Sequence, residues 1–207
     1  MSKPRHGLSL SWGLGAAILP ALADAHLVTT GMGPLCDGLV HFSASPEDYL
    51  PVLVLGLFAG LRGPRQSRLT LGALTVAWLA GGCMSLIAPF PPPTALTIAT
   101  ALLFVVLGGL LAWNADTPAW VAMGAGLAIG LVRGLDNLRG APLELPTALV
   151  LVAICGCVLV MFALSSSLTL PLKRLWMITA VRVGGSWMAA IGLLLTGWII
   201  RYGNQLH

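Results

Sequence analysis

Long apolar segments separated by short polar or proline-rich breaks constrain the fold of this chain more than any other feature. A helix rises about 1.5 Å per residue and the hydrocarbon core of a bilayer is about 30 Å thick, so a membrane span needs about 20 apolar residues. We therefore expect an all-α fold, a polytopic integral membrane helix bundle with about six transmembrane helices. The six expected segments are 48–61, 70–88, 94–113, 118–134, 146–166 and 176–200.

The composition supports a membrane protein. Only 9% of the residues are charged and 57% are hydrophobic, whereas a soluble domain carries about 25% charged residues. The net charge is +4, and the basic residues are scattered at the ends of the apolar segments. This placement is typical of membrane orientation and not of a nucleic-acid surface. The expected partner is the lipid bilayer, and nucleic acid is excluded.

The first 25 residues have the organisation of a secretory signal peptide. Lys3 and Arg5 precede a short apolar stretch, and Ala23 and Ala25 supply small residues at the −3 and −1 positions of a cleavage site. We expect a signal peptide over 1–25 and a single transmembrane domain over 26–207, with His26 as the mature amino terminus. The alternative is an uncleaved first transmembrane helix.

The distribution of basic residues predicts the orientation. With the mature amino terminus outside, the loops at 62–68 and 171–174 face the cytoplasm and carry five of the eight basic residues counted. The remaining three, Arg133, Arg139 and Arg201, lie on the external side. The positive-inside rule favours this arrangement. We expect a multi-pass protein of the inner (plasma) membrane with its mature amino terminus on the periplasmic or external side.

Small residues recur at four-residue spacing in several segments. Such spacing lets membrane helices approach closely, so it predicts a tight bundle or a homo-oligomer. The residues concerned are Gly56 and Gly60, then Gly126, Gly130 and Gly134, and finally Gly185 and Ala189.

Polar residues able to bind a metal gather just after the expected cleavage site. If 36–42 is helical, Asp37 and His41 lie four residues apart on one helix face. Asp48 follows at the start of the next segment, and His26 would offer an imidazole and a terminal amine. Imidazole and carboxylate groups suit a first-row divalent cation. The alternative is structural, with these residues capping the next helix or lying at the membrane interface.

A second polar cluster lies at 130–140. Arg133, Asp136 and Asn137 occupy positions i, i+3 and i+4, so Arg133 and Asp136 are expected to pair. The simpler interpretation is a salt bridge at a helix end. A role in the metal site would need this end to face the opening stretch, which the expected topology allows, and Asp136 is then a further candidate ligand.

The sequence lacks the common catalytic and nucleotide-binding motifs. It has no P-loop, no G-x-S-x-G, no H-E-x-x-H and no C-x-x-C-H haem attachment site. We therefore expect a protein that is not an enzyme and holds no permanently bound cofactor. Any transport would be passive or driven by a gradient.

The stretch "GLVHFSASPEDYLPVLVLGLFAG" is similar to the motif G-x-x-H-P-x-x-G-x-D-H-L-L. This motif is typical of the HupE/UreJ family of hydrogenase and urease accessory membrane proteins, which the chain resembles in several segments. His41 matches the motif histidine, Asp48 matches the aspartate, and Tyr49 stands where the family has a second histidine. The closing segment "VRVGGSWMAAIGLLLTG" also matches the family pattern.

The segment "GLAIGLVRGLDN" resembles the family's H-G-x-x-H-G-x-E. Ile129 and Arg133 replace its two histidines, and Asp136 replaces the glutamate. The resemblance implies a secondary permease for a divalent cation, of the nickel or cobalt type, or another metal-handling membrane protein. The alternative function is a non-transporting accessory or assembly factor that partners a metalloenzyme during its maturation. The candidate metal ligands are His26, Asp37, His41, Asp48 and Asp136.

Overall fold

The computed structural model describes residues 30–87, 92–114, 116–172 and 174–202, and this part of the chain is all helical. The expected signal peptide and His26 lie outside the described residues. The helices are α1 (Pro34–Ala44), α2 (Pro46–Gly60), α3 (Pro64–Ile87), α4 (Pro93–Trp113), α5 (Ala119–Asn137), α6 (Leu145–Thr169) and α7 (Leu175–Tyr202).

The helix boundaries follow from prolines. Proline stands in the first turn of α1, α2, α4 and α6, where its missing N–H costs nothing because that donor has no partner within the helix. The carboxyl end of α4 is closed by Asn114, which adopts the left-handed conformation at φ 52° and so ends the helix.

The number of long helices differs from the expected six. Among the described residues, five helices are long and apolar enough to cross a membrane, namely α3 to α7. The segment expected at 48–61 is helical and forms α2, but this helix has only 15 residues and extends about 22 Å, so it is not among the five. Ser45 is extended between α1 and α2, and Pro46 lacks the N–H that would continue the first helix. The fold is that of a helical membrane bundle, with a broken helical segment in place of its first expected span.

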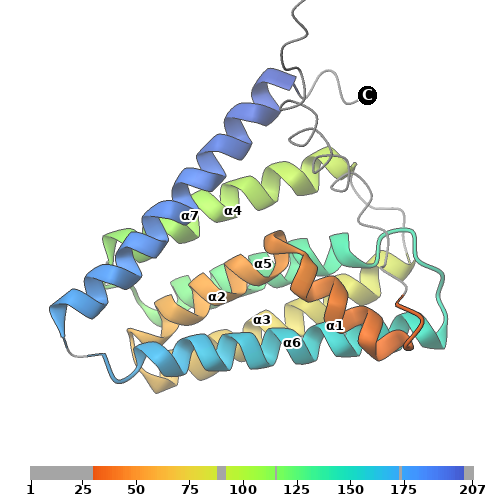
Figure 1. Cartoon of the computed structure of the whole chain (residues 1–207), viewed down its shortest axis with the longest axis horizontal. Helices are drawn as coiled ribbons and strands as arrows, with labels where there is room; N and C mark the ends of the chain where they lie inside the picture. The colour runs from red at the N-terminus through yellow and green to blue at the C-terminus, as the bar shows by residue number, and fades with distance from the viewer. Residues whose placement is uncertain (1–29, 88–91, 115, 173, 203–207) are drawn as a thin grey trace, which may run out of the picture.

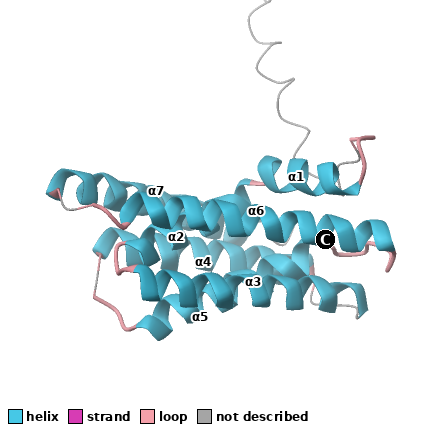
Figure 2. Cartoon of the chain, turned by 90° about the horizontal axis from the view of Figure 1, so that it is seen from below, coloured by secondary structure: helices cyan, strands magenta, loops and turns pink. Residues whose placement is uncertain are grey.

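The helices associate in pairs (Figures 1 and 2). The α3 helix packs most closely on α5, α4 packs on α7, and both α1 and α2 pack along α6. In Figure 1, α4 and α7 lie side by side and diverge from the layer formed by α2, α3, α5 and α6. This arrangement brings the start of α2, the first half of α4 and the end of α5 to the same region of the bundle.

Glycines make the close helix contacts, as their spacing predicted. Gly130 and Gly134 lie directly against the backbone of α3 at Leu74 and Trp78, and a Cβ on Gly185 would lie 2.7 Å from the nitrogen of Ala112 in α4. Gly60 lies against Ser166 and Thr169 of α6. Side chains larger than hydrogen would push these helices apart.

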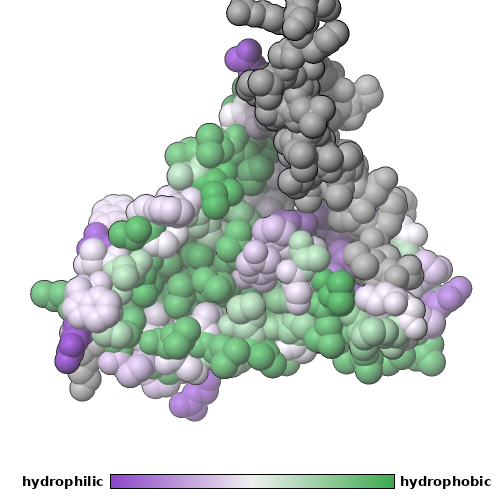
Figure 3. Space-filling view, viewed as in Figure 1, coloured by the Kyte–Doolittle hydropathy of each residue, from purple (hydrophilic) through white to green (hydrophobic). Residues whose placement is uncertain are grey.

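The outer surface of the bundle is apolar. Large hydrophobic side chains on α7 are strongly exposed, including Trp187 at 72% and Leu194 at 74%. The face drawn in Figure 3 is mostly hydrophobic, with hydrophilic residues towards its ends and in one patch near its middle. An apolar exterior over helices of this length is what lipid hydrocarbon requires.

Candidate functional site

A buried ion pair joins the start of α2 to the end of α5. Arg133 Nε donates to Asp48 Oδ1 at 2.7 Å. The Asp48 side chain is fully buried and that of Arg133 is 6% exposed. Charged groups this deep are retained only when they are paired and hydrogen-bonded. The two residues therefore depend on each other.

The guanidinium of Arg133 also binds a second carboxylate. Its Nη1 donates to Asp136 Oδ2 at 2.8 Å, which confirms the expected i, i+3 pair. The same nitrogen lies 3.4 Å from the hydroxyl of Thr100 in α4. The Asp136 side chain is 33% exposed, so one guanidinium links a fully buried carboxylate with one that solvent reaches.

His41 and Asn137 complete the surroundings of Asp48. His41, in the last turn of α1, places Nε2 at 3.8 Å from Asp48 Oδ2 and is itself buried. In the orientation that its neighbours favour, the Asn137 amide nitrogen donates to both oxygens of Asp48, at 3.2 and 3.3 Å, and to the Arg133 carbonyl at 3.2 Å. Two helices, α1 and α5, thus contribute polar side chains to the one carboxylate that α2 supplies.

The break between α1 and α2 creates this geometry. His41 and Asp48 are seven positions apart, so in a continuous helix they would lie about 10.5 Å apart along the axis. The extended backbone at Ser45 instead turns the two helices so that these side chains meet. Asp48 also lies in the first turn of α2, where the helix dipole favours a negative charge.

Three of the five predicted ligands belong to this cluster. His41 and Asp48 are in contact, and Asp136 is connected to Asp48 through Arg133. Within the described ranges, no group of three His, Cys, Asp or Glu side chains is arranged to hold a metal ion. Arg133 occupies the space between the two carboxylates, so the cluster as it stands is a closed ion-pair network.

Asp37 has a separate, local role. Its Oδ1 accepts bonds from the backbone nitrogen and the hydroxyl of Thr30, both at 2.6 Å. These bonds, the hydroxyl bond most of all, lower the pKa of Asp37 below its ordinary value of 3.8. The contact fixes the chain at the entry to α1, whereas His41 on the same helix is turned towards Asp48.

Two features of the cluster could hardly be predicted from the sequence. The pairing of Asp48 with Arg133 joins residues 85 positions apart, and no local spacing predicts it. Thr100 is one of three threonines in the first half of α4, and only its burial at 6% exposure and its contact with Arg133 distinguish it. Asn137 was recognisable as the i+4 neighbour of Arg133, but its contact with Asp48 depends on how the helices pack.

Comparisons of the chain with protein-family models, with curated proteins and with solved structures give no match. The similarity to HupE/UreJ proteins therefore stays a prediction from the motifs. The class that the fold and the cluster define is a helical membrane protein with a buried carboxylate, guanidinium and imidazole network near one end of the bundle.

Proposed function

We propose that this protein is a secondary permease for a divalent first-row cation, of the nickel or cobalt type, in the inner membrane. The observation that carries the proposal is that Asp48 and Asp136 both bind the single guanidinium of Arg133, with His41 beside them. Two carboxylates and an imidazole form a ligand set suited to such cations. Charged residues inside a membrane bundle mark functional sites more often than structural ones.

In this proposal Arg133 is a tethered cation that closes the empty site. A divalent cation carries twice the charge of the guanidinium and competes with it for Asp48 and Asp136. When the guanidinium moves aside, the two carboxylates and His41 become available as ligands. When the cation leaves, Arg133 returns between Asp48 and Asp136 and offsets the repulsion between their negative charges.

The exposed edge of the cluster gives the direction of entry. Asp136 is partly exposed and Asp48 is buried behind it, so a cation meets Asp136 first. We place this end of the bundle on the external side, as the basic loops predict, and propose Asp37 and His26 as further ligands that capture the cation there. The protein acts as a transporter and not as an enzyme, and the metal is its cargo.

Uptake by reconstituted protein tests this function. Purified protein in proteoliposomes loaded with a metal-sensitive dye is given Ni²⁺ or Co²⁺ outside, and the initial rate of dye response is measured. Asp136→Asn keeps the shape of the side chain but removes its charge, and we expect it to lose most of the uptake. The matched control is Glu144→Gln, because Glu144 is an exposed acidic residue at the same end of the bundle.

The uptake rates distinguish a permease from a protein that transports no cation. Loss in Asp136→Asn with normal rates in Glu144→Gln supports the permease. Equal rates in the wild type, both variants and protein-free vesicles contradict it. Thermal melting of each variant in detergent confirms that any loss is not caused by unfolding.

A second candidate function is favoured by the completeness of the ion-pair network. Since Arg133 already neutralises both carboxylates, the cluster can serve as a structural clamp in a non-transporting accessory factor that docks a metalloenzyme during its maturation. In that case the vesicles show no uptake, and the external loops bind the partner protein.

The expected cleavage is tested by mass spectrometry of the protein purified from membranes. An intact mass corresponding to 26–207 supports a signal peptide and places His26 at the mature terminus. A mass that includes residues 1–25 removes the terminal amine from the proposed capture site.

A further inference from the structure

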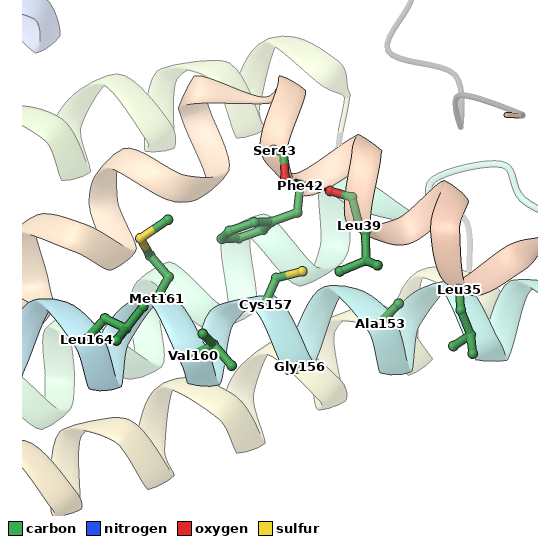
Figure 4. A pocket seen from close by; sticks show the side chains of 10 residues that line it. All are labelled: Leu35, Leu39, Phe42, Ser43, Ala153, Gly156, Cys157, Val160, Met161 and Leu164. Carbon is green, nitrogen blue, oxygen red and sulfur yellow. Dashed lines mark hydrogen bonds between the residues drawn. The ribbon is translucent and has the colours of Figure 1, made fainter.

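An apolar cavity lies between α1 and α6, on the side of α1 away from the ion-pair cluster. Its volume is about 530 Å³, within the range of small-molecule sites. Leu35, Leu39 and Phe42 of α1 form one wall, and Gly156 and Cys157 of α6 lie on the other (Figure 4). No part of the proposed permease site is needed to form it.

The lining offers a ligand almost no polar contact. The only hydroxyl is that of Ser43, and it already donates to the Leu39 carbonyl at 2.8 Å. No charged side chain is present among the lining residues. A ligand that fits must itself be apolar, because a buried polar group without a partner costs free energy.

The shape of the cavity favours an elongated ligand. On α6 the lining runs from Ala153 to Leu164, which is about 16 Å along the helix axis. On α1 it runs from Leu35 to Ser43 beside it. In Figure 4 the side chains of the two helices border one continuous strip along α6. This geometry suits a linear hydrocarbon chain.

The cavity is continuous with the lipid-facing surface of the bundle. Leu35 and Leu39 at its α1 edge are 50% and 49% exposed, and Val160 and Leu164 at its α6 edge are 59% and 60% exposed. The α6 helix is long and apolar enough to cross the membrane, so the mouth opens towards bilayer hydrocarbon. A lipid chain can enter sideways without meeting water.

We propose that this cavity binds one acyl chain of a membrane phospholipid. The bound chain fills the space between α1 and α6 and supports the last turn of α1. Phe42 in that turn lines the cavity and packs on Trp78, with ring centroids 6.4 Å apart. Its neighbour His41 contacts Asp48. The lipid therefore holds in place the turn that positions His41.

Photo-crosslinking tests the proposal. The full chain is reconstituted in phosphatidylcholine vesicles that contain a trace of phosphatidylcholine with a diazirine in its acyl chain. After illumination, labelled peptides are identified by mass spectrometry. We expect label concentrated on the cavity residues of α1 and α6 and little on the equally exposed surface of α7.

A cavity-filling variant supplies the decisive comparison. A Cβ on Gly156 would meet nothing within 4 Å, so Gly156→Leu occupies the cavity without a backbone clash. Gly124→Leu is the matched control, because Gly124 also faces open space on a membrane helix. We expect the cavity label to fall to the level of an unilluminated sample in Gly156→Leu and to persist in Gly124→Leu.

Three results would overturn the proposal. The first is unchanged cavity labelling in Gly156→Leu, and the second is uniform labelling of α6 and α7 in the wild type. The third is a dimer crosslinked through Cys157, which would show that a second copy of the chain covers the cavity. If Gly156→Leu does not fold, Val160→Phe at the cavity mouth provides the same comparison. Neither the lipid test nor its failure depends on metal uptake.

Discussion

Asp48 and Arg133 lie 85 positions apart in the chain, yet Arg133 Nε donates to Asp48 Oδ1 at 2.7 Å inside the bundle. This pair fastens the broken α1–α2 segment to the end of α5. The Asp48 side chain is fully buried and that of Arg133 is 6% exposed, so the charge of Asp48 is stable only because the guanidinium is present.

Arg133→Met should strongly destabilise the protein. The methionine fills a similar volume, but Asp48 is left buried without its countercharge, and removal of one partner of a buried pair costs about 3–5 kcal/mol. The free energy of unfolding in detergent micelles, measured by titration with a denaturing detergent, gives the loss. The exposed Arg65 provides the control, and Arg65→Met should change stability by less than about 0.5 kcal/mol.

The double variant Arg133→Met with Asp48→Asn should recover part of this loss, because it removes the fully buried charge and leaves only Asp136, which is 33% exposed, without its partner. A double variant as unstable as the sum of the two single variants would show that the residues do not interact.

The packing of α3 against α5 should be disturbed by a single methyl group added at Gly81. A Cβ on Gly81 would lie 2.7 Å from the carbonyl oxygen of Leu131, so Gly81→Ala must push the helices apart at a cost of about 1–3 kcal/mol. Gly124→Ala meets open space and should stabilise α5 by about 0.5–1 kcal/mol, since alanine is the better helix former. Opposite signs of the two stability changes are the expected result, and the same sign would contradict the packing.

A hydrogen bond between α6 and α2 should contribute to the stability of the protein near the carboxyl end of α2. The hydroxyl of Thr169 in α6 lies 3.1 Å from the Leu57 carbonyl of α2 and 3.1 Å from the Ser166 carbonyl of its own helix, so its one hydrogen is shared between the two acceptors. Thr169→Val keeps the shape and removes this donor, and bonds of this kind in membrane proteins contribute about 0.6 kcal/mol on average. Thr179→Val is the control, because the Thr179 hydroxyl bonds only within its own helix, to Leu175. If Thr169→Val and Thr179→Val change the free energy of unfolding equally, the interhelical bond does not contribute to stability.

Acid should weaken the contact between Asp37 and Thr30 at the start of α1. The Thr30 bonds lower the pKa of Asp37 in the folded protein below the value of 3.8 expected for the unfolded chain. The stabilisation is therefore fully present above pH 3.8 and is lost as the pH falls through the lower, folded pKa. Nuclear magnetic resonance titration of the Asp37 carboxyl carbon in micelles measures this pKa directly.

Thr30→Ala should raise the pKa of Asp37 part of the way towards 3.8, because the hydroxyl bond is lost and the backbone bond remains. Thr30→Ser retains the hydroxyl and should keep the pKa low. The same pKa in all three proteins would show that the hydroxyl has no influence.

Much of the fold was predictable because its signals are local. Apolar length defined α3, α4, α5, α6 and α7, and prolines defined where most helices begin. The spacing of Arg133 and Asp136 predicted their pair, since both residues lie on one helix. The segment expected at 48–61 is a helix close to those bounds, Pro46–Gly60, but its 15 residues are too few for it to count among the five helices long enough to cross a membrane.

The sequence by itself determined that this chain forms a helical membrane bundle, and it identified His41, Asp48 and Asp136 as unusual polar residues in apolar surroundings. Only the tertiary structure decided that Arg133 lies between the two aspartates and that Asp37 turns away to Thr30. The physical reason is that apolar length and helix periodicity act over a few turns, whereas the meeting of α2, α4 and α5 depends on packing contacts between helices that are far apart in the chain. Those contacts brought a guanidinium to the position where the residue pattern had predicted a metal ion.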